Sequence, residues 1–218
     1  MTLPEVVSRE EWWAARTPLL AKEKEHSKAR DALHAQRRAL PMFPVENYVF
    51  DTADGKRSLV ELFEGRRQLI VYHFMKPSDS GNQFCVGCSF WIDNMPYHME
   101  HLHARDTTLM VDCPVPLADF LAHRERMGWK VKAVSSAGTS FYDDFNFDLV
   151  PGATTIPGIT VFIRDDDDNV YCSYSTAFRG TDLVNNTYNY LDLTALGRQE
   201  EGLPFKWAWL KYHDEYDN

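Results

Sequence analysis

The order of apolar and polar segments along the chain predicts a mixed α/β domain. Apolar runs of strand length occupy residues 68–75, 107–113 and 131–136, amphipathic segments of helical length occupy 89–106 and 116–129, and residues 159–176 have the pattern of two strands joined at four consecutive Asp residues. Strands that alternate with helices predict a parallel sheet covered on both faces, and the late hairpin adds an antiparallel edge.

The first forty residues predict a long helix. Ser8 and Glu11 form an S-x-x-E capping box, and Pro41 ends the helix. Thr17 and Pro18 indicate that the helix restarts there, since proline is favoured at a first helical position. An apolar stripe predicts that this arm packs on the main domain; its members are Leu19, Leu20, Ala29, Leu33 and Leu40.

The pattern of apolar and polar residues changes after Pro41 and Pro44. This change divides the chain into a helical extension, residues 1–45, and one domain, residues 46–218. The remaining predicted elements are a short strand and turn within 48–56, a short helix at 58–65, a last helix at 188–200 and an aromatic C-terminal tail. The sequence thus predicts a single sheet-based domain with an added N-terminal helix.

Composition and charge narrow the range of partners. The chain has 218 residues, 44% of them hydrophobic, which is enough for a substantial core. Its formal net charge of -9 repels phosphate backbones and anionic lipids, so we expect neither nucleic acid nor membrane as a partner. The sequence has no apolar run near the roughly 20 residues that span a bilayer and no signal-peptide pattern at its start, and we expect a cytoplasmic protein.

The stretch FCVGCSFWID, residues 84–93, carries the strongest chemical pattern. Cys85 and Cys88 lie two residues apart, between a buried strand and a helix. Free N–H groups and the helix dipole at a helix N-terminus stabilise a thiolate, so Cys85 is placed to attack a disulfide and Cys88, one turn later, to resolve the product. In a reducing compartment a CxxC pair is more often catalytic or metal-binding than a structural crosslink.

Zinc and peroxidase chemistry fit the same residues less well. A zinc finger has about 12 residues between its cysteine and histidine pairs, whereas nine separate Cys88 from His98 here. A peroxiredoxin-like peroxidase carries P-x-x-x-T-x-x-C, and neither Cys85 nor Cys88 ends that pattern. We therefore expect no metal at this site, and peroxidase chemistry remains a minor alternative.

Four side chains near the cysteine pair are candidates for lining the site. Phe84 and Trp91 either line a groove or pack in the core. His73, on the strand that leads to the site, is either a base or, as the better interpretation, a core histidine satisfied by the backbone. Asp93 lies five positions beyond Cys88, which is not the same helical face, so a surface or capping role is favoured over accepting the Cys88 proton.

Other cysteines and acidic residues predict structural roles. Cys113 and Cys172 fall in or beside apparent strands, where isolated cysteines are usually small buried hydrophobic residues. Asp165, Asp167 and Asn169 imitate the start of a calcium-binding loop. The glycine and the bidentate glutamate of such a loop are missing, and a solvated hairpin turn is the better interpretation.

Several longer strings are similar to those of a known family. They include EEWWAARTPLLAKEKE, CVGCSFWID, ERMGWKVKAVSS and LDLTALGRQE, and they run in order from residue 10 to the end of the chain. The chain resembles the bacterial family of thioredoxin-like proteins catalogued as domain of unknown function 899, whose members are described as predicted dithiol–disulfide oxidoreductases. The resemblance implies a thioredoxin-like fold, an N-terminal helical extension and redox work at Cys85 and Cys88.

Two further implications concern the surroundings of the cysteines. In thioredoxin-like folds a cis-proline before a strand faces the CxxC and presents the substrate backbone, and Pro157 occupies that sequence position. Ordinary thioredoxins have WCGPC, whereas here Phe84 precedes Cys85 and Val86-Gly87 separates the cysteines. Because this dipeptide tunes the reduction potential, the direction of exchange stays open.

The sequence thus leads to the hypothesis of a thiol–disulfide oxidoreductase whose only cofactor is the Cys85–Cys88 disulfide. Its partners would be a disulfide-containing protein or a small disulfide, and a separate reductant that recycles the pair. The tail KWAWLKY, residues 206–212, indicates either a cover for the sheet or a homodimer contact. A non-catalytic binding or scaffold protein with the same fold is the alternative.

Overall fold

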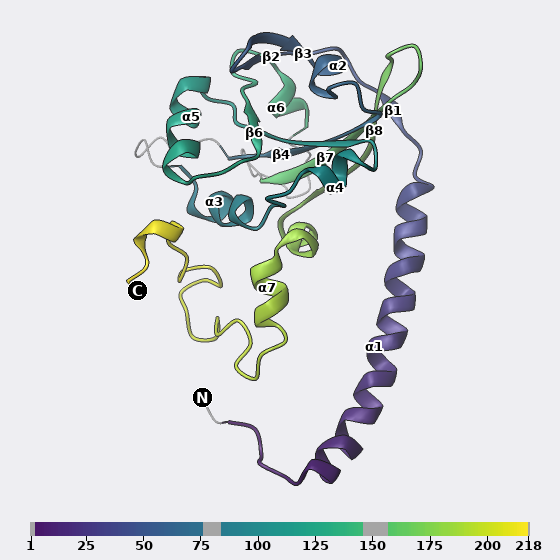
Figure 1. Ribbon diagram of the computed structural model, residues 1–218, viewed down its shortest axis with the longest axis vertical. Coiled ribbons are helices and arrows are strands. Elements are labelled where there is room, and N and C mark those ends of the chain that lie inside the picture. The colour runs from purple at the N-terminus through teal and green to yellow at the C-terminus, as the bar shows by residue number, and fades with distance from the viewer. Residues whose placement is uncertain (1–2, 76–83, 146–156, 218) are drawn as a thin grey trace.

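The computed structural model describes residues 3–75, 84–145 and 157–217. Within them the main sheet has six strands in the order β1-β8-β7-β4-β5-β6 (Figure 1). The strands are β1 (Phe43–Pro44), β4 (Gln68–His73), β5 (Thr107–Asp112), β6 (Lys132–Val134), β7 (Gly158–Arg164) and β8 (Val170–Ala177). Strands β4, β5 and β6 are parallel, whereas β7, β8 and β1 each pair antiparallel with their neighbour.

Helices and a small hairpin surround this sheet. The helices are α1 (Arg9–Arg38), α2 (Leu59–Leu62), α3 (Val86–Asp93), α4 (Glu100–His103), α5 (Leu117–Arg126), α6 (Phe141–Asp144) and α7 (Asn186–Leu191), with short 3₁₀ turns η1 (Phe178–Val184) and η2 (His213–Glu215). The hairpin consists of β2 (Val49–Thr52) and β3 (Gly55–Ser58). A parallel β4-α3-β5 unit next to the β7-β8 hairpin, with α7 following, is the thioredoxin-like arrangement, which confirms the predicted fold class.

Alternation along β4 divides the core into two layers. Leu69 and Val71 point to the face covered by β2, α2 and α6, while Tyr72 and Phe74 point to the face covered by α3 and α5. The pattern follows from the two-residue period of a strand, which sends successive side chains to opposite faces. Both faces are apolar, as a central strand requires.

The N-terminal helix corrects two predictions. Ser8 caps α1 with the predicted capping box, but the helix continues through Pro18 without a restart. Thr17 is a residue of this helix, and its hydroxyl donates to the carbonyl of Trp13 one turn earlier. No described residue of α1 is buried, so the prediction that the arm packs on the domain was wrong. Figure 1 shows α1 standing beside the body as a long rod.

The last predicted helix is also shorter than expected. Helix α7 begins after Asn185, whose side chain accepts from the N–H of Tyr188, and it ends at Leu191. Beyond it the chain turns, and Arg198 folds back to pair with Asp192 at 2.7 Å. The two residues are six positions apart, which places them on different faces of a continuous helix, so a helical pattern could not reveal this ion pair. The Asp run forms the predicted hairpin turn between β7 and β8.

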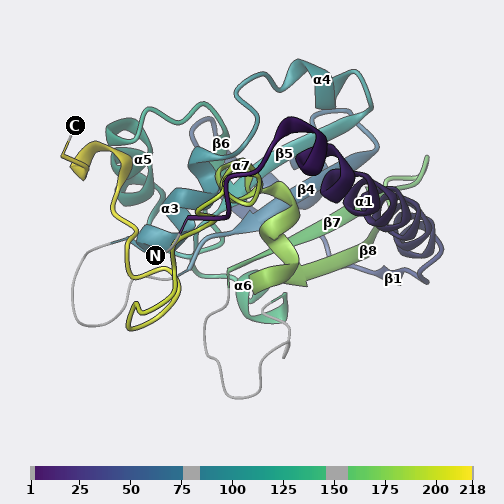
Figure 2. The same cartoon turned by 90° about the horizontal axis from the view of Figure 1, so that it is seen from below.

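The C-terminal segment, residues 178–217, returns to the body and is held there by side-chain contacts. Figure 2 shows it running past α3 and α5. The Tyr212 hydroxyl donates to the carbonyl of Phe84, and Arg126 of α5 pairs with Asp214 at 2.9 Å. This segment thereby becomes a neighbour of the residues just before Cys85.

Burial of His73 makes the folding stability of the protein depend on pH. His73 Nε2 lies 2.8 Å from Thr160 Oγ1, and burial lowers the pKa of His73 from 6.5 to about 4. The unfolded chain therefore binds this proton at a higher pH than the folded protein does. The stability that neutral His73 contributes is present above pH 6.5 and is lost as the pH falls toward 4.

We expect the stability difference between the wild type and His73→Gln to shrink by about 2 kcal/mol between about pH 7.5 and about pH 5, because only the wild type must keep this imidazole neutral. Urea unfolding at both pH values measures the difference. The control is His26→Gln on exposed α1, which should show no such change. A difference for His73→Gln that is independent of pH would contradict the assignment.

Candidate active site at the cysteine pair

Cys85 caps helix α3 with its side chain. It has extended backbone angles, and its Sγ accepts a hydrogen bond from the N–H of Cys88 at 3.3 Å. The carbonyl of Cys85 accepts from the N–H of Ser89 at 3.0 Å and begins the helical ladder. The sulfur thus occupies the place of the oxygen of an ordinary Ser or Asp cap, where free N–H groups favour a negative charge.

Cys88 lies one turn further on and is buried. Its Sγ accepts from the N–H of Met75 at 3.5 Å, and the hydroxyl of Tyr72 on β4 favours the charged form of this thiol. The side chain of Met75 also contacts the first cysteine, with 3.9 Å between its Sδ and Cys85 Sγ. Both sulfurs therefore have defined neighbours in the described structure.

The two thiols have opposite acidities. The hydrogen bond from the Cys88 side chain, followed by the backbone N–H groups of Cys88 and Gly87, lowers the pKa of Cys85 from 9.0 to about 6 against the opposing effect of burial. Burial, and then the contact with Cys85, raises the pKa of Cys88 well above its ordinary value. At neutral pH the pair therefore holds one thiolate, on Cys85, and one thiol, on Cys88.

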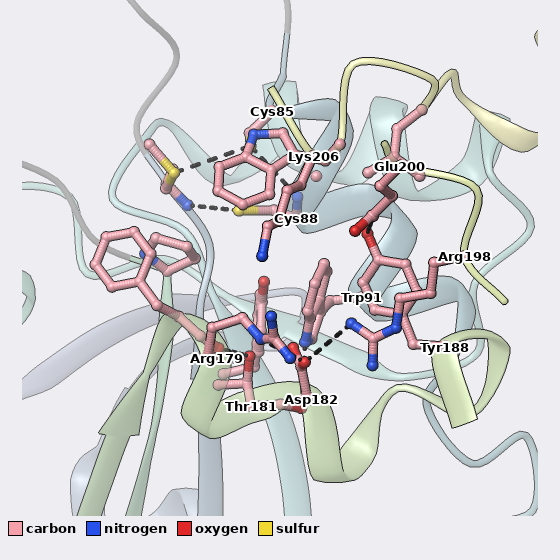
Figure 3. A pocket seen from close by; sticks show the side chains of 17 residues that line it. Cys85, Cys88, Trp91, Arg179, Thr181, Asp182, Tyr188, Arg198, Glu200 and Lys206 are labelled. Carbon is pink, nitrogen blue, oxygen red and sulfur yellow. Dashed lines mark hydrogen bonds and ion pairs between the residues drawn. The ribbon is translucent and has the colours of Figure 1, made fainter. Parts of the chain in front are cut away.

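A pocket of about 360 Å³ opens beside the cysteines (Figure 3). Of the residues singled out from the sequence, Cys85, Gly87, Cys88, Trp91 and Pro157 line it. The other lining residues are Tyr72, Met75, Phe178, Arg179, Thr181, Asp182, Tyr188, Arg198, Glu200, Lys206, Trp207 and Leu210. The structure thus brings five sequence-predicted residues together with a larger group contributed mostly by the C-terminal segment.

Gly87 and Pro157 both line the pocket. A Cβ added at Gly87 would lie 3.7 Å from Cys85 Sγ, which is ordinary van der Waals contact. Pro157 stands directly before β7, but the prediction of a cis bond concerns the peptide that it shares with residue 156, which lies outside the described residues. The cis bond therefore remains a prediction.

Trp91 forms one wall and fixes the segment opposite. Its indole Nε1 donates to the carbonyl of Thr181 at 3.4 Å. Its ring meets Phe90 and Tyr188 edge-on, with centroid distances of 5.5 and 5.7 Å. Trp91 therefore both lines the groove and packs against its neighbours, so the two sequence-based alternatives for this residue hold together.

Three other candidates, His73, Asp93 and Phe84, lie away from the pocket lining. His73 follows Tyr72 and so points to the opposite face of the sheet, toward Thr160. Asp93 accepts from Trp129 Nε1 at 2.7 Å, and its Oδ1 lies 2.9 Å from His213 Nδ1. His73 is thus a core histidine, as favoured, but its partner is the Thr160 hydroxyl and not the backbone. The contacts of Asp93 agree with its surface interpretation.

Phe84 supports the site from within the core. Its ring stacks on His123 with a centroid distance of 4.6 Å, and its carbonyl accepts from the Tyr212 hydroxyl. Phe84 thus positions the residue next to Cys85 without forming part of the pocket wall.

Tyr72 is the neighbour of the buried thiol that sequence reasoning missed. It lies one position before His73, and strand alternation places the two side chains on opposite faces of the sheet. A face assignment for β4 would have identified it. The residues from Phe178 to Leu210 gave no signal that placed them at the cysteines, because only tertiary contacts bring them there. The aromatic tail at 206–212 was singled out only as a cover for the sheet or a dimer contact.

Charged groups of the C-terminal segment form a network at the far end of the pocket. Asp182 pairs with Arg179 at 2.7 Å and with Arg198 at 3.1 Å. The Arg198 guanidinium also lies over the ring of Tyr188, 4.0 Å from its centroid. Glu200 accepts from the hydroxyl of Tyr188 at 2.9 Å. These contacts hold the segment in one conformation as a wall.

The two remaining cysteines are buried elsewhere. Burial raises the pKa of Cys113, and it raises that of Cys172 to about 11. In the described ranges the structure has no group of three or more His, Cys, Asp or Glu side chains suited to hold a metal ion. The described helices also include none with the length and apolar character of a membrane span.

Comparison with solved structures gives distant similarities. A thioredoxin-like protein from Bacteroides caccae is 16% identical with a TM-score of 0.42, over 77% of this chain and 55% of that one, so this chain spans about half of its length. Peroxidoxin BcpB from Mycobacterium tuberculosis is 15% identical with a TM-score of 0.44, over 66% of this chain and 90% of that one. A thiol:disulfide interchange protein from Bacteroides sp. is 13% identical with a TM-score of 0.47, over 70% and 91%.

Comparison with curated proteins gave no significant sequence match. The sequence profile of a family described as "Bacterial protein of unknown function (DUF899)" matches residues 1–216. This range covers nearly the whole chain, including the cysteine pair and the segment that walls the pocket. The chain therefore belongs to the DUF899 family.

Proposed function

We propose that this protein is a thiol–disulfide oxidoreductase in which Cys85 attacks and Cys88 resolves. One observation carries the proposal. A half-buried thiol whose pKa is lowered to about 6 contacts a fully buried thiol whose pKa is raised. Attack requires a thiolate that substrate can reach, and resolution requires a second thiol that stays protonated until it is needed.

In the first step the Cys85 thiolate attacks one sulfur of a disulfide, RS–SR. A Cys85–S–SR bond forms, the RS–SR bond breaks, and RS⁻ leaves and takes a proton. The N–H groups that stabilised the Cys85 thiolate now face a neutral sulfur. The negative charge has moved to the leaving group.

In the second step Cys88 becomes the nucleophile. Its pKa was raised in part by the neighbouring Cys85 thiolate, and that contribution ends once Cys85 is bonded to substrate. The Cys88 proton passes to solvent or to the released thiolate, and the hydroxyl of Tyr72 and the N–H of Met75 stabilise the anion. Attack on Cys85 Sγ forms the Cys85–Cys88 disulfide and releases the second RS⁻, so two electrons pass to the substrate.

The cycle closes only if a reductant returns both cysteines to thiols. We propose a separate dithiol reductase or a small thiol for this role, in a cytoplasmic setting that supplies such reductants. The proposed chemistry requires no cofactor besides the cysteine pair. A non-catalytic scaffold is the opposing hypothesis, and it predicts two unreactive thiols.

The pH dependence of alkylation tests the Cys85 pKa. We expect the rate of Cys85 alkylation by iodoacetamide to rise to half of its maximum near pH 6, because only the thiolate reacts. In Cys88→Ala the lost hydrogen bond should slow alkylation at pH 6 by about fivefold. Cys85→Ser is the control and should lack the fast reaction. A midpoint at the ordinary value of 9.0 would support the scaffold hypothesis.

The reduction potential tests the proposed function directly. Equilibration with glutathione buffers, followed by thiol trapping and mass spectrometry, should give a reversible Cys85–Cys88 disulfide. Because the hydrogen bonds to the Cys85 thiolate stabilise the reduced form, we expect a potential above about -270 mV, the value of thioredoxin. Cys88→Ser should instead accumulate a mixed disulfide at Cys85. If no reversible disulfide forms in the wild type, the oxidoreductase proposal fails.

Substitution of Tyr72 tests the second step alone. Tyr72→Phe removes the hydroxyl that favours the charged form of Cys88 and retains the ring. We expect resolution of the mixed disulfide to slow about tenfold, since a hydrogen bond to a charged group contributes about 1.5 kcal/mol. Alkylation of Cys85 should be unchanged. Tyr97→Phe, at an exposed tyrosine, is the matched control, and equal resolution rates in both variants would show that Tyr72 has no such role.

A further inference from the structure

The pocket at the cysteine pair has the size and shape of a small-molecule site. Its volume of about 360 Å³ lies within the range of roughly 300–1,000 Å³ that is typical of ligand pockets. Its walls include four apolar side chains, those of Trp91, Phe178, Trp207 and Leu210. Phe178 and Trp207 are 38% and 50% exposed, so these two lining side chains present accessible apolar surface.

The C-terminal segment also restricts which substrates reach Cys85. It runs across the side of the site from Phe178 to Leu210 and is held in place by the Trp91–Thr181 and Phe84–Tyr212 hydrogen bonds. An extended polypeptide that approaches from this side would meet the segment, whereas a small molecule can enter the pocket that the segment walls. The geometry therefore favours a low-molecular-weight disulfide over a protein disulfide.

The charges in the pocket favour an anionic substrate. Three cationic side chains and two anionic ones line it, in a chain whose formal net charge is -9. Arg198 is engaged by Asp182 and Asp192, and Glu200 accepts from Tyr188. In the described part of the chain, Lys206 has neither an ion pair nor a hydrogen bond.

The positions of Lys206 and Arg179 point to the place of the anion. Figure 3 shows the Lys206 amine and the Arg179 guanidinium directed into the same space, between Cys88 and Asp182. Arg179 uses its Nε for Asp182, which leaves its terminal nitrogens to face the cavity. Two like charges directed at one space form a favourable site for a carboxylate.

We propose that this pocket binds a small disulfide with an apolar body and a carboxylate group, held by Lys206 and Arg179 while Cys85 attacks its sulfur. The proposal rests on the oxidoreductase function proposed above. The exchange is the same: the substrate disulfide accepts two electrons, the Cys85–Cys88 disulfide forms, and two carboxylate-bearing thiols leave. The cations also reduce the repulsion between the Cys85 thiolate and the incoming carboxylate.

Three symmetric disulfides of similar size test the charge preference. They are dithiodipropionate, which is anionic, hydroxyethyl disulfide, which is neutral, and cystamine, which is cationic. Each is mixed with reduced protein in a single turnover, and its rate is divided by its rate with free dithiothreitol. We expect dithiodipropionate to react about fivefold faster than hydroxyethyl disulfide on this scale, as for a partly exposed ion pair, and cystamine to react slowest.

The matched variants assign the preference to the pocket. Lys206→Met should lower the rate with dithiodipropionate about fivefold relative to the rate with hydroxyethyl disulfide, so that the ratio of the two rates falls to about one. Lys211→Met, on the same segment but outside the pocket lining, should retain the advantage. Insulin provides the polypeptide disulfide and should be reduced more slowly than dithiodipropionate.

The outcomes separate the two proposals. If disulfides oxidise the cysteine pair but show no preference for the anion, or if Lys206→Met leaves the preference intact, the carboxylate site is wrong and the oxidoreductase proposal stands. A faster reaction with insulin would also overturn the small-molecule inference. If none of the disulfides oxidises the pair, both proposals fail.

Discussion

The hydrogen bond from the backbone N–H of Cys88 to Cys85 Sγ caps helix α3 and stabilises the Cys85 thiolate through the same contact. A cap must accept hydrogen bonds, and a thiolate accepts them better than a thiol does. Helix formation and thiol acidity therefore depend on one another. The second cysteine occupies the next turn, where burial has the opposite effect on its pKa. The difference between the two thiols follows from their positions at one helix end.

Strand β4 determines what lies beneath this pair. Its alternation sends Tyr72 toward Cys88 and His73 to the other face, where Thr160 lies within hydrogen-bond distance. The groups that stabilise the buried sulfur are thus the N–H of Met75 and a phenol on the strand. The carboxylate on the helix, Asp93, instead contacts Trp129 and His213. Tyr72 and His73 are adjacent in the strand, yet one lies beneath the cysteine pair and the other lies in the core on the opposite face of the sheet.

The C-terminal segment converts an open helix end into a walled pocket. Its own structure is irregular, and ion pairs such as those of Asp182 with Arg179 and Arg198 hold it in place, together with the hydrogen bonds of Trp91 and Tyr212. In the function that we propose, the fold provides the reactive thiol, and the segment provides the volume, the apolar walls and the charges that discriminate among substrates. This division agrees with the general rule that function resides in sites added to a common fold.

The sequence alone determined the order of strands and helices and the position of the cysteine pair before a helix, because these depend on local periodicity, capping residues and short spacings. The thioredoxin-like class came from the resemblance to a known family. The sequence misjudged α1, since an apolar stripe does not reveal whether a partner surface exists, and it placed the end of the last helix too late. Tertiary structure alone decided that Tyr72 contacts Cys88 and that Lys206 and Arg179 face one pocket. These contacts join residues far apart in the chain, and no local pattern encodes the fold that brings them together.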